Sequence, residues 1–209
     1  MLNISVLVSG GGTNLQALID AQNGGGIPGG RINLVISSSG KAYALRRAEK
    51  AGIRTEVLVR KSFASQEAYD AELVNLLESA GTGLVILAGF MTIISGKVIS
   101  KYKNKIINIH PSLIPSFCGE GYYGLHVHEA ALKKGVKVTG ATVHFVNEIC
   151  DGGPIILQKA VQVKDGDTPE TLQQRVMRQA EWQILPKAAA LFCAGKLEVK
   201  NGTVKIKED

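Results

Sequence analysis

An amide and an imidazole stand two residues apart at the end of an apolar run, in Lys105-Ile-Ile-Asn-Ile-His-Pro-Ser. Residues two apart in a strand point to the same side, so Asn108 and His110 project together while Ile109 enters the core. Pro111 ends the strand directly afterwards and places both polar side chains at its carboxyl end, where open α/β sheets bind ligands. A histidine alone at such a place would more often only hydrogen-bond a loop, so the predicted site depends on partners.

A carboxylate partner is available in Cys150-Asp151-Gly152-Gly153-Pro154, a tight loop whose glycines permit unusual backbone angles. A carboxylate beside an imidazole raises the imidazole pKa and fixes the ring, which would make His110 a general acid at neutral pH. Asn108 can hydrogen-bond a developing oxyanion without carrying charge. Taken singly, Asp151 would be an ordinary turn aspartate. Together the three side chains suit acyl transfer to an amine, which is its own nucleophile.

A glycine-rich segment, Ser9-Gly-Gly-Gly-Thr-Asn, lies between the first predicted strand and the first predicted helix. One interpretation is a tight turn in which Thr13 or Asn14 caps the helix. The other is a phosphate cradle, because a helix N-terminus offers unbonded N–H groups and a positive dipole end. Leu15 stands where a dinucleotide fingerprint requires a glycine. The place beside the ligand edge of the sheet therefore favours a phosphate monoester at Gly12, Thr13 and Asn14.

The elements that position these residues alternate between short apolar runs and amphipathic stretches, which predicts an α/β fold with a Rossmann-like, doubly wound, mostly parallel sheet. The expected strands are 3–9, 32–37, 55–59, 84–88 and 105–109, and the expected helices are 13–22, 42–51 and 66–79.

The second half changes character, because two β-rich runs, 138–146 and 154–163, follow each other without a helix between them. We expect them to extend the sheet with at least one antiparallel neighbour. A long helix should start with Thr168 as its N-cap and run to about Gly195, with a bend or break at Pro186. A small hairpin with an Asn-Gly turn, 197–199 with 204–206, should follow.

The composition favours small anionic ligands. The chain carries 24 Lys and Arg against 18 Asp and Glu residues, a net charge of +6, and only 5% of its residues are aromatic. Scattered basic residues without interleaved aromatic side chains do not predict nucleic-acid binding. No apolar run reaches the roughly 18 residues of a membrane span, and no basic leader precedes the first strand. We expect a cytoplasmic protein that contacts no membrane.

The cysteines and the remaining histidines predict no metal site. Cys118, Cys150 and Cys193 are odd in number and form no CxxC pair, which argues against a disulfide framework and against zinc. His126 and His128 open a helix or lie in a loop, and no acidic or cysteine partner has ligand spacing. His144, on a predicted strand, should either contact the catalytic side chains without reacting itself or be a hydrogen-bonded core histidine. The cysteines near Asp151 are expected to be inert.

Several linked motifs resemble one known family. Asn-Ile-His-Pro-Ser-Leu-Ile-Pro, Gly-Leu-His-Val-His-Glu-Ala, Gly-Ala-Thr-Val-His-Phe-Val and Asp-Gly-Gly-Pro-Ile-Ile follow in the order typical of folate-dependent formyltransferases. The resemblance runs from Ser9 to Pro186. It implies one formyltransferase domain over 1–209, with a phosphate-binding half, 1–100, and a catalytic and folate-binding half, 101–209. It also implies that 10-formyltetrahydrofolate donates its formyl group to the amine of glycinamide ribonucleotide in purine synthesis, without a metal.

The same resemblance assigns the site residues. The catalytic Asn, His and Asp of the family fall on Asn108, His110 and Asp151, and its phosphate loop falls on Gly12, Thr13 and Asn14. The acidic contact to the glycinamide part falls on Glu181. The folate-binding positions would be Met91, Thr92, Ile93, Ile94, Asn147, Glu148, Ile149 and Cys150. The partners would then be small molecules alone, bound by a monomer or a homodimer.

Three positions depart from the family pattern. Thr92 and Gln66 stand where a basic side chain often meets the folate. The Cys118–Gly124 segment is longer than the usual connection, and it is either a mobile lid or a passive surface insertion.

Three other functions stay open. Methionyl-tRNA formyltransferases and formyltetrahydrofolate hydrolases share the core motifs, although we expect here neither the tRNA domain of the first nor the regulatory domain of the second. A non-catalytic nucleotide-binding module would leave the conjunction of Asn108, His110 and Asp151 unexplained.

Overall fold

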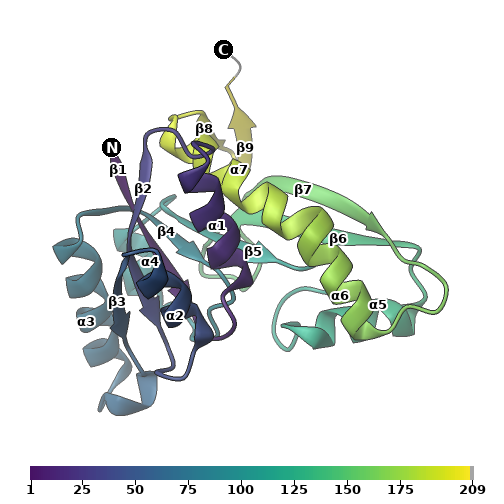
Figure 1. The fold of residues 1–209 in the computed structure, drawn as a ribbon, viewed down its shortest axis with the longest axis horizontal. Helices are drawn as coiled ribbons and strands as arrows, with labels where there is room; N and C mark the ends of the chain where they lie inside the picture. Colours follow the sequence, from purple (N-terminus) through teal and green to yellow (C-terminus); the bar gives the residue numbers. More distant parts are fainter. Residues whose placement is uncertain (208–209) are drawn as a thin grey trace. The chain divides into compact units, whose positions relative to one another are not determined.

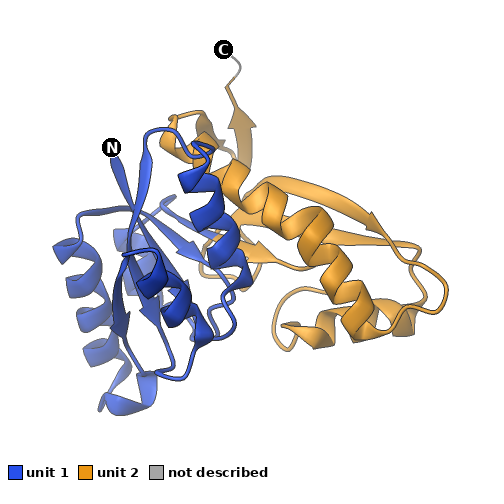
Figure 2. Cartoon of the chain, in the orientation of Figure 1, with its two compact units in different colours: residues 1–107 blue, residues 108–209 orange. Residues whose placement is uncertain are grey.

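A computed structural model of the chain describes residues 1–207, which form two compact units (Figures 1 and 2). The first is Met1–Ile107 and the second begins at Asn108, so that the boundary falls inside strand β5 (Ile106–His110). The seven-stranded sheet has the order β3-β2-β1-β4-β5-β6-β7. Strand β1 pairs in parallel with β2 and β4, and β7 pairs antiparallel with β6. The predicted mostly parallel α/β fold is confirmed.

The first unit is built from strand–helix repeats. Its inner strands are buried over most of their length, as in β1, where Ile4, Val6, Leu7 and Val8 are fully buried. Continuous burial of this kind requires cover on both faces of a strand. Helices α1 and α2 pack on each other, as do α3 and α4. The elements are β1 (Leu2–Val8), α1 (Thr13–Asn23), β2 (Gly30–Ser37), α2 (Tyr43–Lys50), β3 (Arg54–Val57), the 3₁₀ turn η1 (Arg60–Ser62), α3 (Gln66–Ser79), β4 (Thr82–Leu87) and α4 (Gly96–Lys101).

The second unit packs a long interrupted helix against the β6–β7 pair. The helix begins where the sequence predicts, because the Thr168 side chain accepts a hydrogen bond from the Thr171 amide and Pro169 occupies the first helical position. Its elements are α5 (Leu125–Lys134), β6 (Val138–Phe145), β7 (Ile155–Gln162), α6 (Pro169–Val176), the π turn η2 (Met177–Glu181), α7 (Trp182–Cys193), β8 (Leu197–Lys200) and β9 (Thr203–Ile206).

The interruption of the long helix lies at the π turn η2, whereas the sequence predicted it at Pro186. Pro186 lies inside α7 and is the fifth residue of that helix. The hydrogen bond that a proline removes would run to the carbonyl of Trp182, the first residue of α7, so the loss falls at the junction with η2. The proline is therefore tolerated without ending the helix.

Of the short helices, α4 was not predicted from the sequence and α5 was left open between a helix and a loop. Helix α4 has only six residues, too few to show a periodic apolar pattern, and α5 settles the open choice between helix and loop for His126 and His128. The terminal hairpin is as predicted, with Asn201 and Gly202 both at positive φ in the turn. None of the helices in residues 1–207 is both long enough and apolar enough to cross a bilayer.

Candidate active site

Four polar side chains of the second unit, Asp151 among them, form one largely buried cluster. His110 Nδ1 lies 3.5 Å from Asp151 Oδ2, and His144 Nε2 lies 3.6 Å from Asp151 Oδ1. Asn108 Nδ2 lies 3.2 Å from His144 Nε2. The three residues predicted to be catalytic are thus gathered together, with His144 as a fourth member.

The ends of two strands and one loop bring this cluster together. Asn108 and His110 lie at the carboxyl end of β5, and His144 is the penultimate residue of β6. Asp151 follows in the next loop at φ 54°, a left-handed conformation in which aspartate is several-fold enriched. The loop then returns against β6 so closely that a Cβ on Gly153 would lie 1.7 Å from the Phe145 carbonyl oxygen. Glycine at 153 therefore allows the return that aims Asp151 inward.

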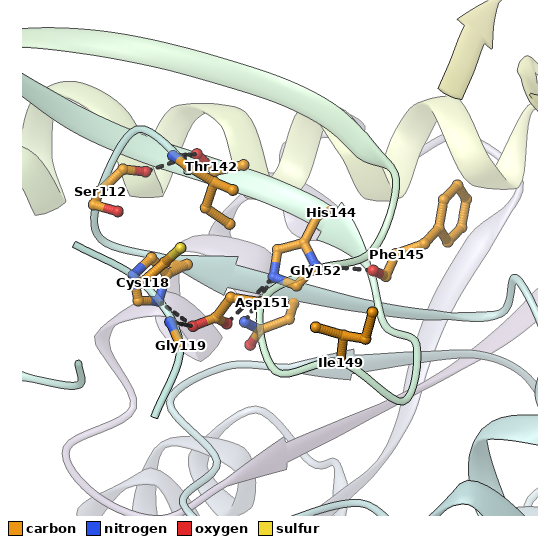
Figure 3. A network of polar contacts seen from close by, with 12 residues as sticks. Ser112, Cys118, Gly119, Thr142, His144, Phe145, Ile149, Asp151 and Gly152 are labelled. Atoms are coloured by element: carbon orange, nitrogen blue, oxygen red, sulfur yellow. Dashed lines mark hydrogen bonds and ion pairs between the residues drawn. The ribbon is translucent and has the colours of Figure 1, made fainter. Parts of the chain in front are cut away.

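Backbone groups of the segment after β5 complete the cluster. The Gly119 amide donates to Asp151 Oδ2 over 2.9 Å, as Figure 3 shows. His110 Nε2 lies 2.9 Å from the Phe117 carbonyl oxygen, which can only accept, so Nε2 carries a proton. Neither backbone group could be predicted from residue types, because any residue supplies a backbone carbonyl and amide. The Cys118–Gly124 segment, predicted to be a lid or a passive insertion, thus begins in direct contact with Asp151.

Thr142 on β6 anchors the same segment (Figure 3). Its hydroxyl donates to the Ser112 carbonyl over 2.7 Å and accepts the Ile114 amide over 3.1 Å. The Gln158 side-chain amide on β7 donates to the Thr142 hydroxyl and to the Ile114 carbonyl, both over 3.0 Å. The backbone that leads from His110 to Phe117 is therefore held to two strands by side-chain hydrogen bonds.

The tautomer of His144 follows from its neighbours. Its Nδ1 lies 2.8 Å from the Phe145 carbonyl oxygen and donates to it (Figure 3). In the neutral ring Nε2 then accepts, and the Asn108 side-chain nitrogen is its donor. His144 therefore orients the Asn108 amide with its nitrogen toward the cluster.

The protonation of His110 differs from the sequence prediction. Burial lowers the pKa of His110 below that of an exposed histidine, and the Asp151 charge and the Phe117 carbonyl offset this only in part. The predicted elevation of its pKa by the carboxylate is present but smaller than the effect of burial. At pH 7 the ring is therefore mostly neutral, with its proton on Nε2 and an unprotonated Nδ1 facing Asp151.

Asp151 is ionised at the same pH. Burial opposes the charge, but the interaction with the His144 ring, the attraction to the His110 ring whenever that ring is protonated, and the hydrogen bond from the Gly119 amide outweigh it and hold the pKa of this carboxyl below its ordinary value. A neutral base beside a fixed carboxylate can accept a proton at Nδ1 and be stabilised as an imidazolium. The cluster is thus equipped to remove a proton from an attacking amine and to return it.

A third histidine of the second unit, His128 on α5, is fully buried, and neither of its ring nitrogens has a hydrogen-bond partner among the described residues. Burial, together with the nearby charge of His110, lowers the pKa of His128 to about 4. His126 differs, since it is exposed and lies 3.0 Å from Glu129. His128 is therefore neutral in the folded protein at every pH above about 5.

We expect the free energy of unfolding to fall as the pH drops from about 6.5 toward 4. The unfolded chain binds a proton at His128 near pH 6.5, whereas the folded chain binds it only near 4, so the stability present above 6.5 is lost through this window. A shift of this size corresponds to roughly 3 kcal/mol. Urea unfolding at a series of pH values measures it. His128→Leu should flatten the dependence and His126→Leu should not; equal pH dependence of both variants would contradict the assignment.

The predicted phosphate loop lies in the first unit. Gly12 is the N-cap of α1 in the left-handed conformation, and no side chain caps this helix, so Thr13 and Asn14 do not act as caps. A Cβ on Gly12 would lie 2.6 Å from the Ala44 Cβ, whereas a Cβ on Gly10 or Gly11 would meet no atom within 4 Å. The loop is thus packed on one side and open on the other, as a cradle requires.

The predicted folate-binding residues fall in two loops, one in each unit. In the first unit Met91 and Ile93 expose their apolar side chains, and the Met91 amide donates to the Ser9 hydroxyl. Thr92 and Ile94 lie in the same loop. In the second unit Asn147 closes its loop by bonding the Ile149 amide and the Gly152 carbonyl, which leaves Ile149 exposed. Glu148 and Cys150 are exposed beside it.

Glu181, the predicted contact to the glycinamide part, is the last residue of the π turn η2 and is buried at 6% exposure. Buried acidic side chains are rare, and π turns are frequent at functional sites. No group of three or more His, Cys, Asp or Glu side chains in the described part of the chain is placed to hold a metal ion.

Comparison with known proteins places this arrangement in one family. Residues 2–189 match the formyl transferase family model. The chain is 43% identical to phosphoribosylglycinamide formyltransferase of Escherichia coli, over 95% of this chain and 90% of that protein. It is 47% identical to the trifunctional purine biosynthetic protein adenosine-3 of Bos taurus, of which it spans only 19%. A glycinamide ribonucleotide transformylase 1 from Symbiobacterium toebii superposes with a TM-score of 0.93 at 44% identity, over 100% of this chain and 95% of that one. The chain belongs to the formyl transferase family.

Proposed function

We propose that this chain transfers the formyl group of 10-formyltetrahydrofolate to the amine of 5'-phosphoribosylglycinamide, giving formylglycinamide ribonucleotide and tetrahydrofolate. The observation that carries the proposal is the cluster of Asn108, His110 and Asp151, which offers an amide donor, a neutral base and an ionised carboxylate. His110 contacts Asp151 directly, and Asn108 is linked to Asp151 through His144. Relatives of comparable length are named after 5'-phosphoribosylglycinamide, which supports this molecule as the formyl acceptor. Membership of the formyl transferase family supports transfer of a formyl group.

The residues of the cluster divide the work of an acyl transfer. When the amine attacks the formyl carbon, the carbonyl oxygen gains negative charge. Asn108 has two N–H donors on Nδ2; one is held by His144, and the second is assigned to this oxygen. His110 takes the amine proton at Nδ1, and Asp151 stabilises the imidazolium. The same proton then goes to the departing folate nitrogen as its bond to the formyl carbon breaks, and His110 is neutral again.

The ligand contacts are part of the same proposal. The loop at Gly12, Thr13 and Asn14 would hold the phosphate, and Glu181 would accept hydrogen bonds from the glycinamide part. The exposed apolar side chains of Met91, Ile93 and Ile149 would pack on the folate ring system. The sequence also predicts that the protein is a monomer or a homodimer, acts in the cytoplasm and has no nucleic-acid or membrane partner. These points stay predictions.

The experiment is a tetrahydrofolate-release assay with purified protein, run with and without 5'-phosphoribosylglycinamide. The proposal expects release that depends on the amine and is matched one-to-one by formylated product. Release without the amine would identify a hydrolase instead. Absence of release from folded protein that still binds phosphate monoesters would return the non-catalytic binding module to consideration.

A further inference from the structure

Helix α2 of the first unit is tied to the glycine loop by two hydrogen bonds. The Ala44 amide donates to the Gly10 carbonyl over 3.1 Å. The Arg47 side chain, one turn further along α2, donates from Nε to the Gly11 carbonyl over 2.9 Å. Two successive carbonyl groups of the loop are therefore turned toward α2.

These two bonds fix the direction of two amide donors. In a trans peptide the C=O of one residue and the N–H of the next point in opposite directions, and among the described residues the only cis bond is Ile114–Pro115. Holding the Gly10 and Gly11 carbonyls against α2 therefore turns the Gly11 and Gly12 N–H groups away from it. The Gly12 carbonyl accepts the Gln16 amide and so points along α1. The Thr13 N–H, on the same peptide, therefore points away from the helix at its N-terminus. Three consecutive N–H groups then form an anion-binding concavity on the loop.

Arg47 is itself held in place by its surroundings. Its NH1 donates to the Gln16 side-chain oxygen over 3.1 Å, and its guanidinium lies 5.0 Å from the centre of the Tyr43 ring. Gln16 in turn donates to Asp20 over 2.8 Å. The side chain that bonds Gly11 is thus oriented by contacts from both α1 and α2, and it joins the start of α1 to the loop.

We propose that Arg47 is a positioning residue for phosphate recognition, which keeps the Gly12 amide aimed at the phosphate of the substrate through its Nε–H bond to the Gly11 carbonyl. The inference rests on the proposed function, because it concerns the phosphate of 5'-phosphoribosylglycinamide. It adds a role for α2, which is outside the glycine loop itself. Preorganised donors do not have to be reoriented on binding, so their loss should weaken phosphate binding without slowing the chemical step.

Two uncharged variants separate the hydrogen bond from the charge. Arg47→Gln places its side-chain nitrogen the same number of bonds from the backbone as Arg47 Nε, so it can still donate to the Gly11 carbonyl. Arg47→Met has similar length and no donor. Arg46→Met is the matched control, because Arg46 is an exposed neighbour on the same helix that lies 3.8 Å from Glu49 and, within residues 1–207, has no hydrogen bond to the glycine loop.

The expected result is a difference in KM confined to the phosphate-bearing substrate. Arg47→Met should raise the KM for 5'-phosphoribosylglycinamide about tenfold or more, the size of one lost hydrogen bond to a charged group. Its kcat and its kcat/KM for the dephosphorylated glycinamide riboside should stay within about twofold of wild type, and Arg47→Gln should recover most of the loss. Calorimetric binding of inorganic phosphate should weaken in the same order.

Several outcomes would overturn the inference. Equal weakening by Arg47→Gln and Arg47→Met would assign the effect to charge alone, and an equal loss with the dephosphorylated substrate would show a general structural role. An unchanged KM in Arg47→Met would remove any role in binding. Melting temperatures check folding, and Arg47→Ala is measured in place of Arg47→Met if the latter does not fold. The phosphate calorimetry needs no turnover, so it still tests Arg47 if wild-type protein shows no formyl transfer.

Discussion

Replacing His110 by alanine is expected to lower kcat for formyl transfer about 10³-fold, within the range that general acid–base catalysis contributes. His110 is buried, its Nε2 is held by the Phe117 carbonyl, and its unprotonated Nδ1 faces Asp151. His144 also lies beside Asp151, but its Nδ1 donates to the Phe145 carbonyl and its Nε2 is engaged by the Asn108 amide. Single-turnover kinetics with saturating substrates measure the chemical step directly, so that a change in product release does not enter.

The control for this variant is His126→Ala, which removes an exposed histidine that pairs only with Glu129. It should keep wild-type kcat. Because His110 is buried, the alanine variant is also checked for folding and for binding of 5'-phosphoribosylglycinamide. A folded His110→Ala variant that binds this substrate and retains more than about a tenth of the wild-type rate would exclude His110 as the proton carrier.

Replacing Asp151 by asparagine should have an effect of similar size, about 10²–10³-fold in kcat. The asparagine can still accept the Gly119 amide, so the loop geometry is expected to remain, but the charge that stabilises the His110 imidazolium is gone. The Asp151 charge raises the pKa of His110, so its removal should lower that pKa further. The acid limb of the kcat/KM profile should accordingly move to lower pH.

Asp165→Asn serves as the control for charge, because Asp165 is fully exposed in the same unit and lies 3.9 Å from Lys137. Both variants lose one negative charge, and only Asp151→Asn should lose activity and shift the acid limb. An acid limb that stays in place in Asp151→Asn, despite a lower rate, would mean that the carboxylate does not act through His110.

The placement of two polar side chains at the carboxyl end of β5 was predictable because strand periodicity fixes which side chains share a face and proline fixes where the strand ends. Asn108 and His110 needed no structural information beyond that. Asp151 was reached by its loop chemistry and by resemblance, since residues far apart in sequence meet only through the fold. The Phe117 carbonyl and the Gly119 amide could not be found in this way, because backbone groups leave no mark on residue types.

The pKa of His110 shows why proximity alone is a poor guide to protonation. The neighbouring carboxylate was expected to dominate, yet the burial that brings the two side chains together also removes the water that stabilises a charged imidazole. The prediction that the long helix breaks at Pro186 was wrong for a related reason. It did not take into account that α7 starts at Trp182, four residues before the proline. In both cases the local effect is present, but the surrounding structure determines how large it is.

In the first unit, the glycine loop likewise could be predicted only in part from the local sequence. Three consecutive glycines before a helix predicted the cradle, but the two bonds from α2 that orient it depend on Ala44 and Arg47, more than thirty residues away. An arginine on an amphipathic helix has no sequence signature that separates it from its exposed neighbour Arg46.

The most direct test of the central claim is to follow a ¹³C-labelled formyl group from 10-formyltetrahydrofolate, using wild-type protein with 5'-phosphoribosylglycinamide and mass spectrometry of the products. The cluster of Asn108, His110 and Asp151 predicts that the label appears on the glycinamide amine, with His110→Ala forming this product about 10³-fold more slowly. Label recovered as formate, or equal labelling of the amine by wild type and His110→Ala, would contradict the account.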